Sequence, residues 1–77
     1  MSLDRTITYD PSVDAATVWL HTGTPVSHDR LDDRRGVDRD AEGQALSIEF
    51  LDVSKGVDLR GLPEPERVQR ELEALMI

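Results

Sequence analysis

The sequence contains no cysteine, and this absence excludes two common ways of stabilising a small domain. Without thiols the chain forms neither a disulfide framework nor a thiolate metal site. A domain of this size buries only about 60% of the surface that its unfolded chain exposes. The fold must therefore rely on close packing or on association with another molecule.

Long apolar runs are also absent. No run approaches the roughly 20 residues that a membrane-spanning helix requires. The first ten residues lack the apolar segment of a signal peptide. We therefore expect a cytoplasmic protein that makes no contact with a membrane.

Basic residues are few, with nine Lys and Arg against 16 Asp and Glu, which gives a net charge of −7. Binding to nucleic-acid phosphates needs clustered Lys and Arg, whereas most arginines here alternate with acids. We therefore do not expect a nucleic-acid partner. An acidic surface suits a basic protein partner, although the same charge also keeps a small domain soluble.

What the sequence does contain is alternation of side-chain character with a period of two. This alternation predicts strands at 5–9, 15–20 and 45–51. The polar, charged stretch 26–39 predicts one further strand, irregular and edge-like. Gly43 supplies the positive φ of a hairpin turn before the last strand.

Pairing of Val37 with Ile48 across that hairpin keeps the apolar residues on one face. Beyond the strands, residues 65–76 carry apolar side chains at helical spacing and predict one amphipathic helix. An isolated helix of this length is marginal in water, so its apolar stripe must pack on the sheet or on a second copy. The expected fold is α+β, an antiparallel meander of three to four strands with a C-terminal helix. The expected single domain, 1–77, has a sheet core at 5–55, a linker at 56–64 and the helix at 65–76.

A recognisable pattern is carried by three stretches of the sequence together. They are ITYDP with the later DA, then VDRDAEG, and then IEFLDVS. They resemble the bacterial family called domain of unknown function 2283, over about residues 5–55. The residues Ala16, Arg39, Ser47 and Val53 depart from the residues usual in that family. The resemblance implies a small β-rich domain. It carries over no catalytic residue, because the family has no assigned activity.

The acids Asp38, Asp40, Glu42 and Glu49, together with Gly43, match five positions of an EF-hand calcium loop. An EF-hand needs a helix on each side, whereas both flanks here have the pattern of strands. We therefore interpret the segment as a hairpin with a solvated acidic face. Paired carboxylates can serve as general acid and base, but that chemistry needs a pocket, which an exposed hairpin lacks.

His28 lies in a run of acids and arginines that ends at residue 35. A histidine with the carboxylates of Asp29, Asp32 and Asp33 can hold a divalent metal. Three arginines in the same run neutralise those carboxylates first, so we expect a charged surface loop. We expect no cofactor and no catalytic residue, since no serine elbow or phosphate loop is present in the sequence.

Trp19 lies on the opposite face of its strand from Ala16, Val18 and Leu20. Two interpretations stay open. In the favoured one the C-terminal helix covers Trp19; in the other Trp19 belongs to an interface. The candidate packing or interface residues are Trp19, Val68, Leu72, Leu75 and Met76.

The sequence thus favours a non-enzymatic, self-associating binding or accessory module, a homodimer or small homo-oligomer. One version of this hypothesis is an antitoxin-like partner of a basic protein. The alternative is a small divalent-metal-binding protein or metal-dependent enzyme that uses Asp38, Asp40, Glu49 and His28.

Overall fold

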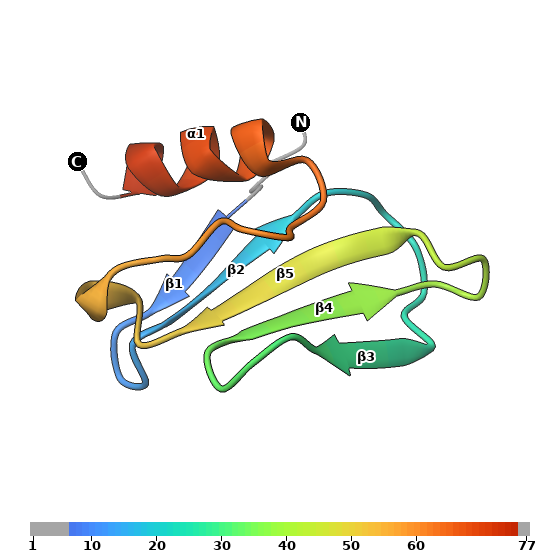
Figure 1. Cartoon of the computed structure of the whole chain (residues 1–77), viewed down its shortest axis with the longest axis horizontal. Coiled ribbons are helices and arrows are strands. Elements are labelled where there is room, and N and C mark those ends of the chain that lie inside the picture. The colour runs from blue at the N-terminus through green and yellow to red at the C-terminus, as the bar shows by residue number, and fades with distance from the viewer. Residues whose placement is uncertain (1–6, 76–77) are drawn as a thin grey trace, which may run out of the picture.

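The computed structural model describes residues 7–75, in which a five-stranded antiparallel sheet is followed by one helix (Figure 1). The strand order is β1-β2-β5-β4-β3, so the longest strand, β5, lies at the centre. The α+β class predicted from the sequence is confirmed. The elements are β1 (Ile7–Asp10), β2 (Ala15–Trp19), β3 (Ser27–Arg30), β4 (Arg35–Arg39), β5 (Ala45–Leu51), the 3₁₀ turn η1 (Val53–Lys55) and α1 (Pro65–Leu75).

The predicted number of strands, three to four, is wrong, because the stretch 26–39 forms two strands instead of one. β3 and β4 are joined by a tight turn in which the N–H of Leu31 donates to the carbonyl of Arg35 at 2.9 Å. All four residues of β3 are exposed and none is apolar, so no alternation marks this strand in the sequence. Its pairing with β4 includes a polar cross-strand contact between His28 and Asp38.

The other predicted strands agree with the structure closely. Residues 45–51 form β5 as expected, and the 15–20 strand ends one residue earlier, at Trp19. The 5–9 strand corresponds to β1, with residues 5 and 6 outside the described range. Val37 pairs with Ile48, so the predicted register is confirmed.

The core lies between one face of the sheet and α1. The strands contribute alternate residues, among which Val18, Val37 and Ile48 have no exposed surface. From α1, Val68 and Leu72 join the same cluster. The helix lies over the β1–β2 side of the sheet (Figure 1), so its apolar stripe packs within the chain. No helix in residues 7–75 is long and apolar enough to cross a membrane.

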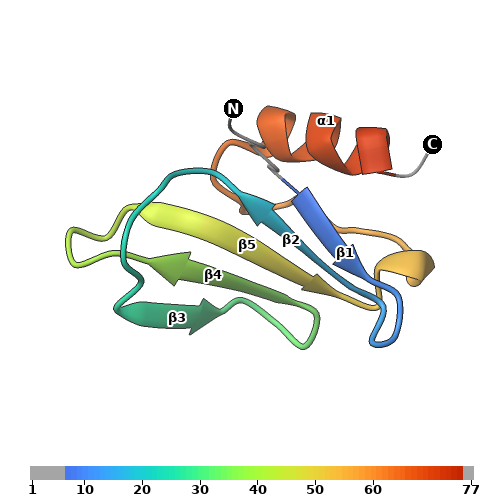
Figure 2. The same cartoon turned by 180° about the vertical axis from the view of Figure 1, so that it is seen from behind.

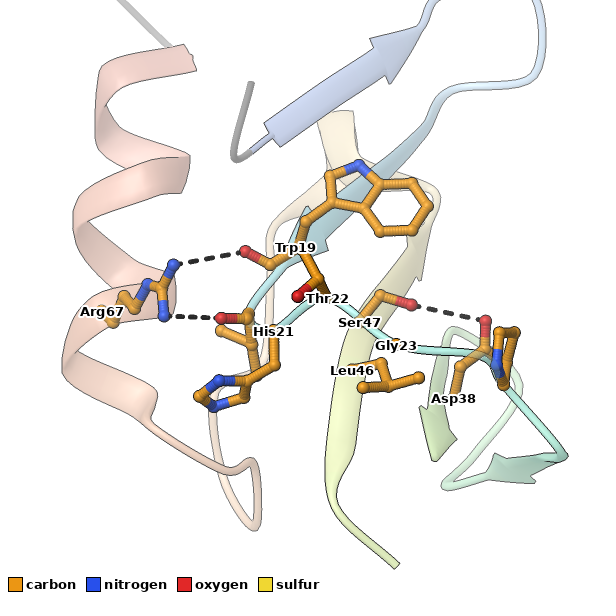
Figure 3. A pocket seen from close by; sticks show the side chains of 10 residues that line it. Trp19, His21, Thr22, Gly23, Asp38, Leu46, Ser47 and Arg67 are labelled. Carbon is orange, nitrogen blue, oxygen red and sulfur yellow. Dashed lines mark hydrogen bonds between the residues drawn. The ribbon is translucent and has the colours of Figure 1, made fainter. Parts of the chain in front are cut away.

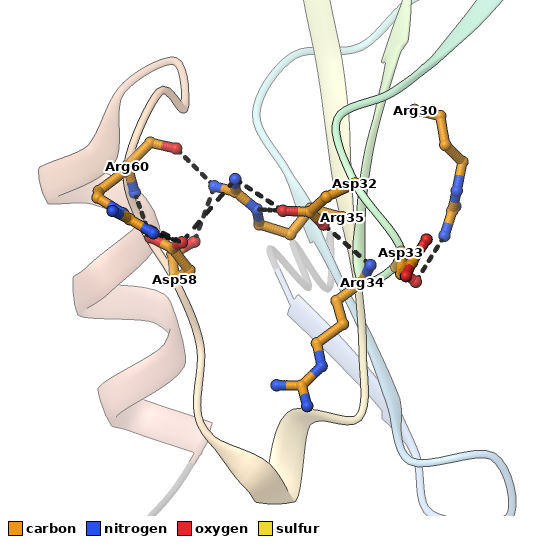
Figure 4. A network of polar contacts seen from close by, with 7 residues as sticks. All are labelled: Arg30, Asp32, Asp33, Arg34, Arg35, Asp58 and Arg60. Carbon is orange, nitrogen blue, oxygen red and sulfur yellow. Dashed lines mark hydrogen bonds and ion pairs between the residues drawn. The ribbon is translucent and has the colours of Figure 1, made fainter.

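The segment 56–64, here called the strap, connects η1 to α1 and packs on the core beside the helix. The side chain of Arg35, only 12% exposed, holds the strap to the sheet (Figure 4). Its guanidinium donates to the carbonyl oxygens of Asp58 and Arg60 and to the carboxylate of Asp32, at 2.9 Å in the last case. Because Arg35 is the first residue of β4 and donates to the strap, it ties the strap to this end of the sheet.

We predict that Leu72→Ala lowers the free energy of unfolding by roughly 2–5 kcal/mol, because it leaves a cavity in the core between α1 and the sheet. Leu72 is 7% exposed. Urea unfolding monitored by circular dichroism measures the loss. The exposed neighbour Arg70→Ala is the control and should change the free energy by less than about 0.5 kcal/mol. A loss for Leu72→Ala no larger than the loss for Arg70→Ala would contradict the packing of Leu72 in the core.

Candidate functional site

The two faces of the sheet differ in what covers them. α1 and the strap cover the face that carries the core. Figure 2 shows the sheet from its other side, which no element within residues 7–75 covers. Directly paired residues point to the same face, so the register places one row of four side chains there. This row, the Trp19 row, consists of Trp19 (β2), Ser47 (β5), Asp38 (β4) and His28 (β3).

Trp19 is 46% exposed. The favoured prediction, that the C-terminal helix covers Trp19 through Val68 and Leu72, is therefore wrong. Successive residues of a strand point to opposite faces, and Val18 is fully buried in the core beneath α1. The helix packs with Val18, which leaves Trp19 on the far side of the sheet. Of the other two candidate interface residues, Met76 and the side chain of Leu75 lie outside the described residues.

A hollow of about 450 Å³ lies beside Trp19 (Figure 3). Ser47 and Leu46 of β5 line it and are almost fully buried, at 3% and 4% exposed. The connection 20–25, between β2 and β3, also lines the hollow, as does Arg67 of α1. The hollow thus extends from the Trp19 row to the first turns of the helix.

The helix end of the hollow carries two basic side chains, which both contact the same carboxylate. The guanidinium of Arg67 donates to the carbonyl of Leu20 at 2.9 Å and lies 3.6 Å from Glu64. The other oxygen of Glu64 lies 2.9 Å from Nε2 of His21. These contacts fix the 19–21 backbone to the start of α1.

The strand end of the hollow carries Asp38, whose side chain is 37% exposed. Nδ1 of His28 lies 2.6 Å from its Oδ1, and the hydroxyl of Ser47 donates to its Oδ2 at 3.3 Å. In a Ser-His-Asp triad the imidazole lies between the hydroxyl and the carboxylate, where it takes the hydroxyl proton. Here the carboxylate lies between the other two groups, so this arrangement does not activate Ser47 as a nucleophile.

His28 does not gather the neighbouring acids that the sequence suggested as metal ligands. Its partner is Asp38 of the adjacent strand. Asp29 points to the opposite face and binds Arg39 at 2.8 Å. Asp32 accepts hydrogen bonds from the turn and from Arg35. Part of the expected charged loop is therefore an edge strand, and its charges are paired across and along the hairpin.

The segment that matches an EF-hand loop is a hairpin between β4 and β5, as predicted. Asp40 does not point toward its neighbouring acids, because Oδ1 accepts the N–H groups of Glu42 and Gln44, each at 2.9 Å. Gly43 adopts a φ of 86°, the positive φ that the sequence predicted. Among residues 7–75, no three or more His, Asp or Glu side chains come together in a way that could hold a metal ion.

A second polar cluster was not predicted from the sequence and consists of Tyr9, Asp14 and Ser54, here called the latch. One oxygen of Asp14 accepts the hydroxyl of Tyr9 at 2.9 Å, and the other accepts the hydroxyl of Ser54 at 2.6 Å. Asp14 has a φ of 53° and its carbonyl accepts the N–H of Val53. The latch thus ties the β1–β2 turn to η1. All three residues belong to the stretches that carry the family resemblance, which was the available signal.

Four aspartates have a pKa below the ordinary value of 3.8, in each case because the carboxylate accepts hydrogen bonds. For Asp10 and Asp14 the main donors are serine hydroxyls, from Ser12 and Ser54. For Asp58 the main donor is the guanidinium of Arg60. The fourth aspartate is Asp32, whose main donor is the N–H of Arg34. These acids thus hold turns and loops in place in their ionised form.

Comparison with protein families finds a match over residues 6–54 to the family described as "Protein of unknown function (DUF2283)". The matched region contains the sheet, the Trp19 row and the latch, whereas the strap and α1 follow it. No curated protein and no solved structure matches the chain.

We predict that Asp14→Ala lowers the thermal unfolding midpoint more than Asp14→Asn does. Alanine loses the carboxylate and is strained at a φ of 53°, whereas asparagine keeps one acceptor oxygen and tolerates that φ. Differential scanning calorimetry measures the midpoints. Asp33→Ala is the matched control, because the Asp33 side chain makes no latch contact. Equal midpoints for Asp14→Ala and Asp33→Ala would show that the latch does not stabilise the fold.

The latch also predicts a dependence on pH. The pKa of Asp14 is lowered in the folded state, so its contribution is complete above the unfolded value and is lost as the pH falls through the folded value. The difference in urea midpoint between wild type and Asp14→Asn should be constant from about pH 7 to 5 and shrink below about pH 4. A difference that grows on acidification would contradict this assignment.

Proposed function

The chain belongs to the DUF2283 family of proteins of unknown function, and we propose that it is a non-enzymatic binding module whose partner docks on the uncovered sheet face around Trp19. The observation that carries this proposal is a tryptophan, 46% exposed, on a face that no helix or strand of residues 7–75 covers. Tryptophan offers a large apolar surface and is enriched among the residues that dominate protein interfaces.

The surroundings of Trp19 suit docking better than catalysis. Beside the indole the same face carries the small side chains of Thr8, Thr17 and Ser47, together with Glu49. The polar row beside it places Asp38 between His28 and Ser47, an order that does not activate a nucleophile. A half-exposed aromatic residue beside a hollow has the form of an interface anchor.

The partner is a second copy of the chain or a different protein. Self-association as a homodimer or small homo-oligomer stays part of the proposal, as do a cytoplasmic location and an antitoxin-like role beside a basic protein. The metal-dependent alternative has less support, because the turn N–H groups of Glu42 and Gln44 engage Asp40 and separate it from Asp38 and Glu49.

We predict that Trp19→Ala weakens partner binding by roughly 30-fold or more, the loss of about 2 kcal/mol that is typical of a central aromatic anchor. Sedimentation velocity at increasing concentration shows whether the partner is a second copy. Affinity capture from cell extract, with the captured protein then titrated in purified form, measures binding to a different protein.

Val13→Ala is the matched control, because Val13 is also exposed and apolar but lies in the β1–β2 turn. It should leave association unchanged. A protein that stays monomeric at high concentration and captures nothing in a Trp19-dependent manner would overturn the proposal.

A further inference from the structure

We infer that the hollow beside Trp19 binds a cationic side chain, arginine or lysine, presented by a basic polypeptide. The inference rests on the proposed binding function and specifies the chemistry of its partner. It depends on three features of the hollow, which are its shape, the two groups that flank it and the balance of charge around it.

The shape follows from the register of three strands. Ser47 of β5 pairs with Trp19 on one side and with Asp38 on the other. Neighbouring strands are about 4.8 Å apart, so the backbones that carry the two larger side chains are about 10 Å apart. The hollow lies beside these three residues, so it is a notch with the indole of Trp19 as one wall and the carboxylate of Asp38 as another, and the small side chain of Ser47 lies between them (Figure 3). A planar guanidinium or an ammonium group fits between these walls.

Both walls attract a cation. The face of an indole binds arginine or lysine electrostatically when the charge lies within about 6 Å of the ring centre. The carboxylate of Asp38 has one contact on each oxygen, from His28 and Ser47, and a carboxylate offers about four acceptor sites. Asp38 is also 37% exposed, so a further donor reaches it from the hollow. An aromatic ring and a carboxylate together favour arginine, which stacks and forms charge-assisted hydrogen bonds.

The charges around the hollow and on the whole chain favour the binding of a cation. The basic groups at the helix end, Arg67 and His21, both contact Glu64, and Arg67 also donates to the Leu20 carbonyl. An anionic ligand would meet Asp38 at the strand end. The net charge of −7 attracts a basic polypeptide from a distance. Shape and charge thus select a cation over an anion.

The test uses the fluorescence of Trp19, the single tryptophan of the sequence, in the full-length protein. An alternating arginine–serine decapeptide is titrated at physiological ionic strength, beside versions in which lysine, glutamine or glutamate replaces arginine. We expect saturable quenching with the arginine peptide, weaker binding of the lysine peptide, and at least about 10-fold weaker binding of the glutamine and glutamate peptides.

Two variants and one control locate the site. Asp38→Asn keeps the size of the side chain and should weaken arginine-peptide binding about 10-fold. Trp19→Ala, followed by calorimetry because the fluorophore is lost, should weaken it to a similar extent. Glu42→Gln removes the same charge from the exposed hairpin tip and should change binding less than about twofold. Circular dichroism establishes that each variant is folded.

Three results would overturn the inference. They are equal binding of the glutamine peptide, no binding of the arginine peptide by folded wild type, and equal weakening by Glu42→Gln and Asp38→Asn, which would indicate diffuse attraction. Each result leaves the proposed function standing if Trp19→Ala still abolishes association with a captured partner or a second copy. If Trp19→Ala leaves that association unchanged while the wild type still binds the arginine peptide, the proposed docking face is overturned instead.

Discussion

A five-stranded sheet has two faces, and the described part of this chain supplies one helix and one strap to cover them. Both pack on the same face, because alternation along β2 and β5 places the apolar residues Val18, Ile48 and Phe50 there. Hydrophobic burial is thus concentrated in a single layer. The other face carries threonine, serine and charged side chains, with Trp19 as its half-exposed aromatic residue. The proposed docking face is a consequence of this one-sided core.

Many of the acidic residues have a structural role in this fold. Asp10, Asp32, Asp40 and Asp58 each accept the backbone N–H two residues ahead, and so each fixes a turn or loop. Asp14 performs a longer-range task, since it joins the β1–β2 turn to η1 through Ser54. Much of the negative charge therefore serves to hold short connections, in a domain with little apolar surface to bury. Asp38 differs, because its side chain lines a hollow instead of closing a turn.

Sequence reasoning succeeded where one local pattern decided the outcome. Period-two alternation identified β2 and β5, the Val37–Ile48 register followed from keeping apolar residues together, and helical spacing identified α1. It failed at β3, whose exposed polar residues are held by cross-strand pairs that only the folded hairpin creates. Trp19 was placed on the correct face from alternation, but which face the helix covers is decided by tertiary packing. The contacts His21–Glu64, Arg67–Leu20 and Asp14–Ser54 each join residues 40 or more positions apart along the chain, so no local pattern reveals them.

The core and the notch beside Trp19 depend on the same register. Val18, Ile48 and Val37 are paired across β2, β5 and β4, and the adjacent row consists of Trp19, Ser47 and Asp38. A slip of one residue in β5 would bring Ile48 between the tryptophan and the carboxylate, and would expose Ile48 while filling the notch. The β4–β5 register shifts directly after Asp38, so this acid is the last residue of β4 in that continuous pairing. Hydrophobic burial on one face therefore fixes the spacing of the two groups to which we assign cation binding on the other.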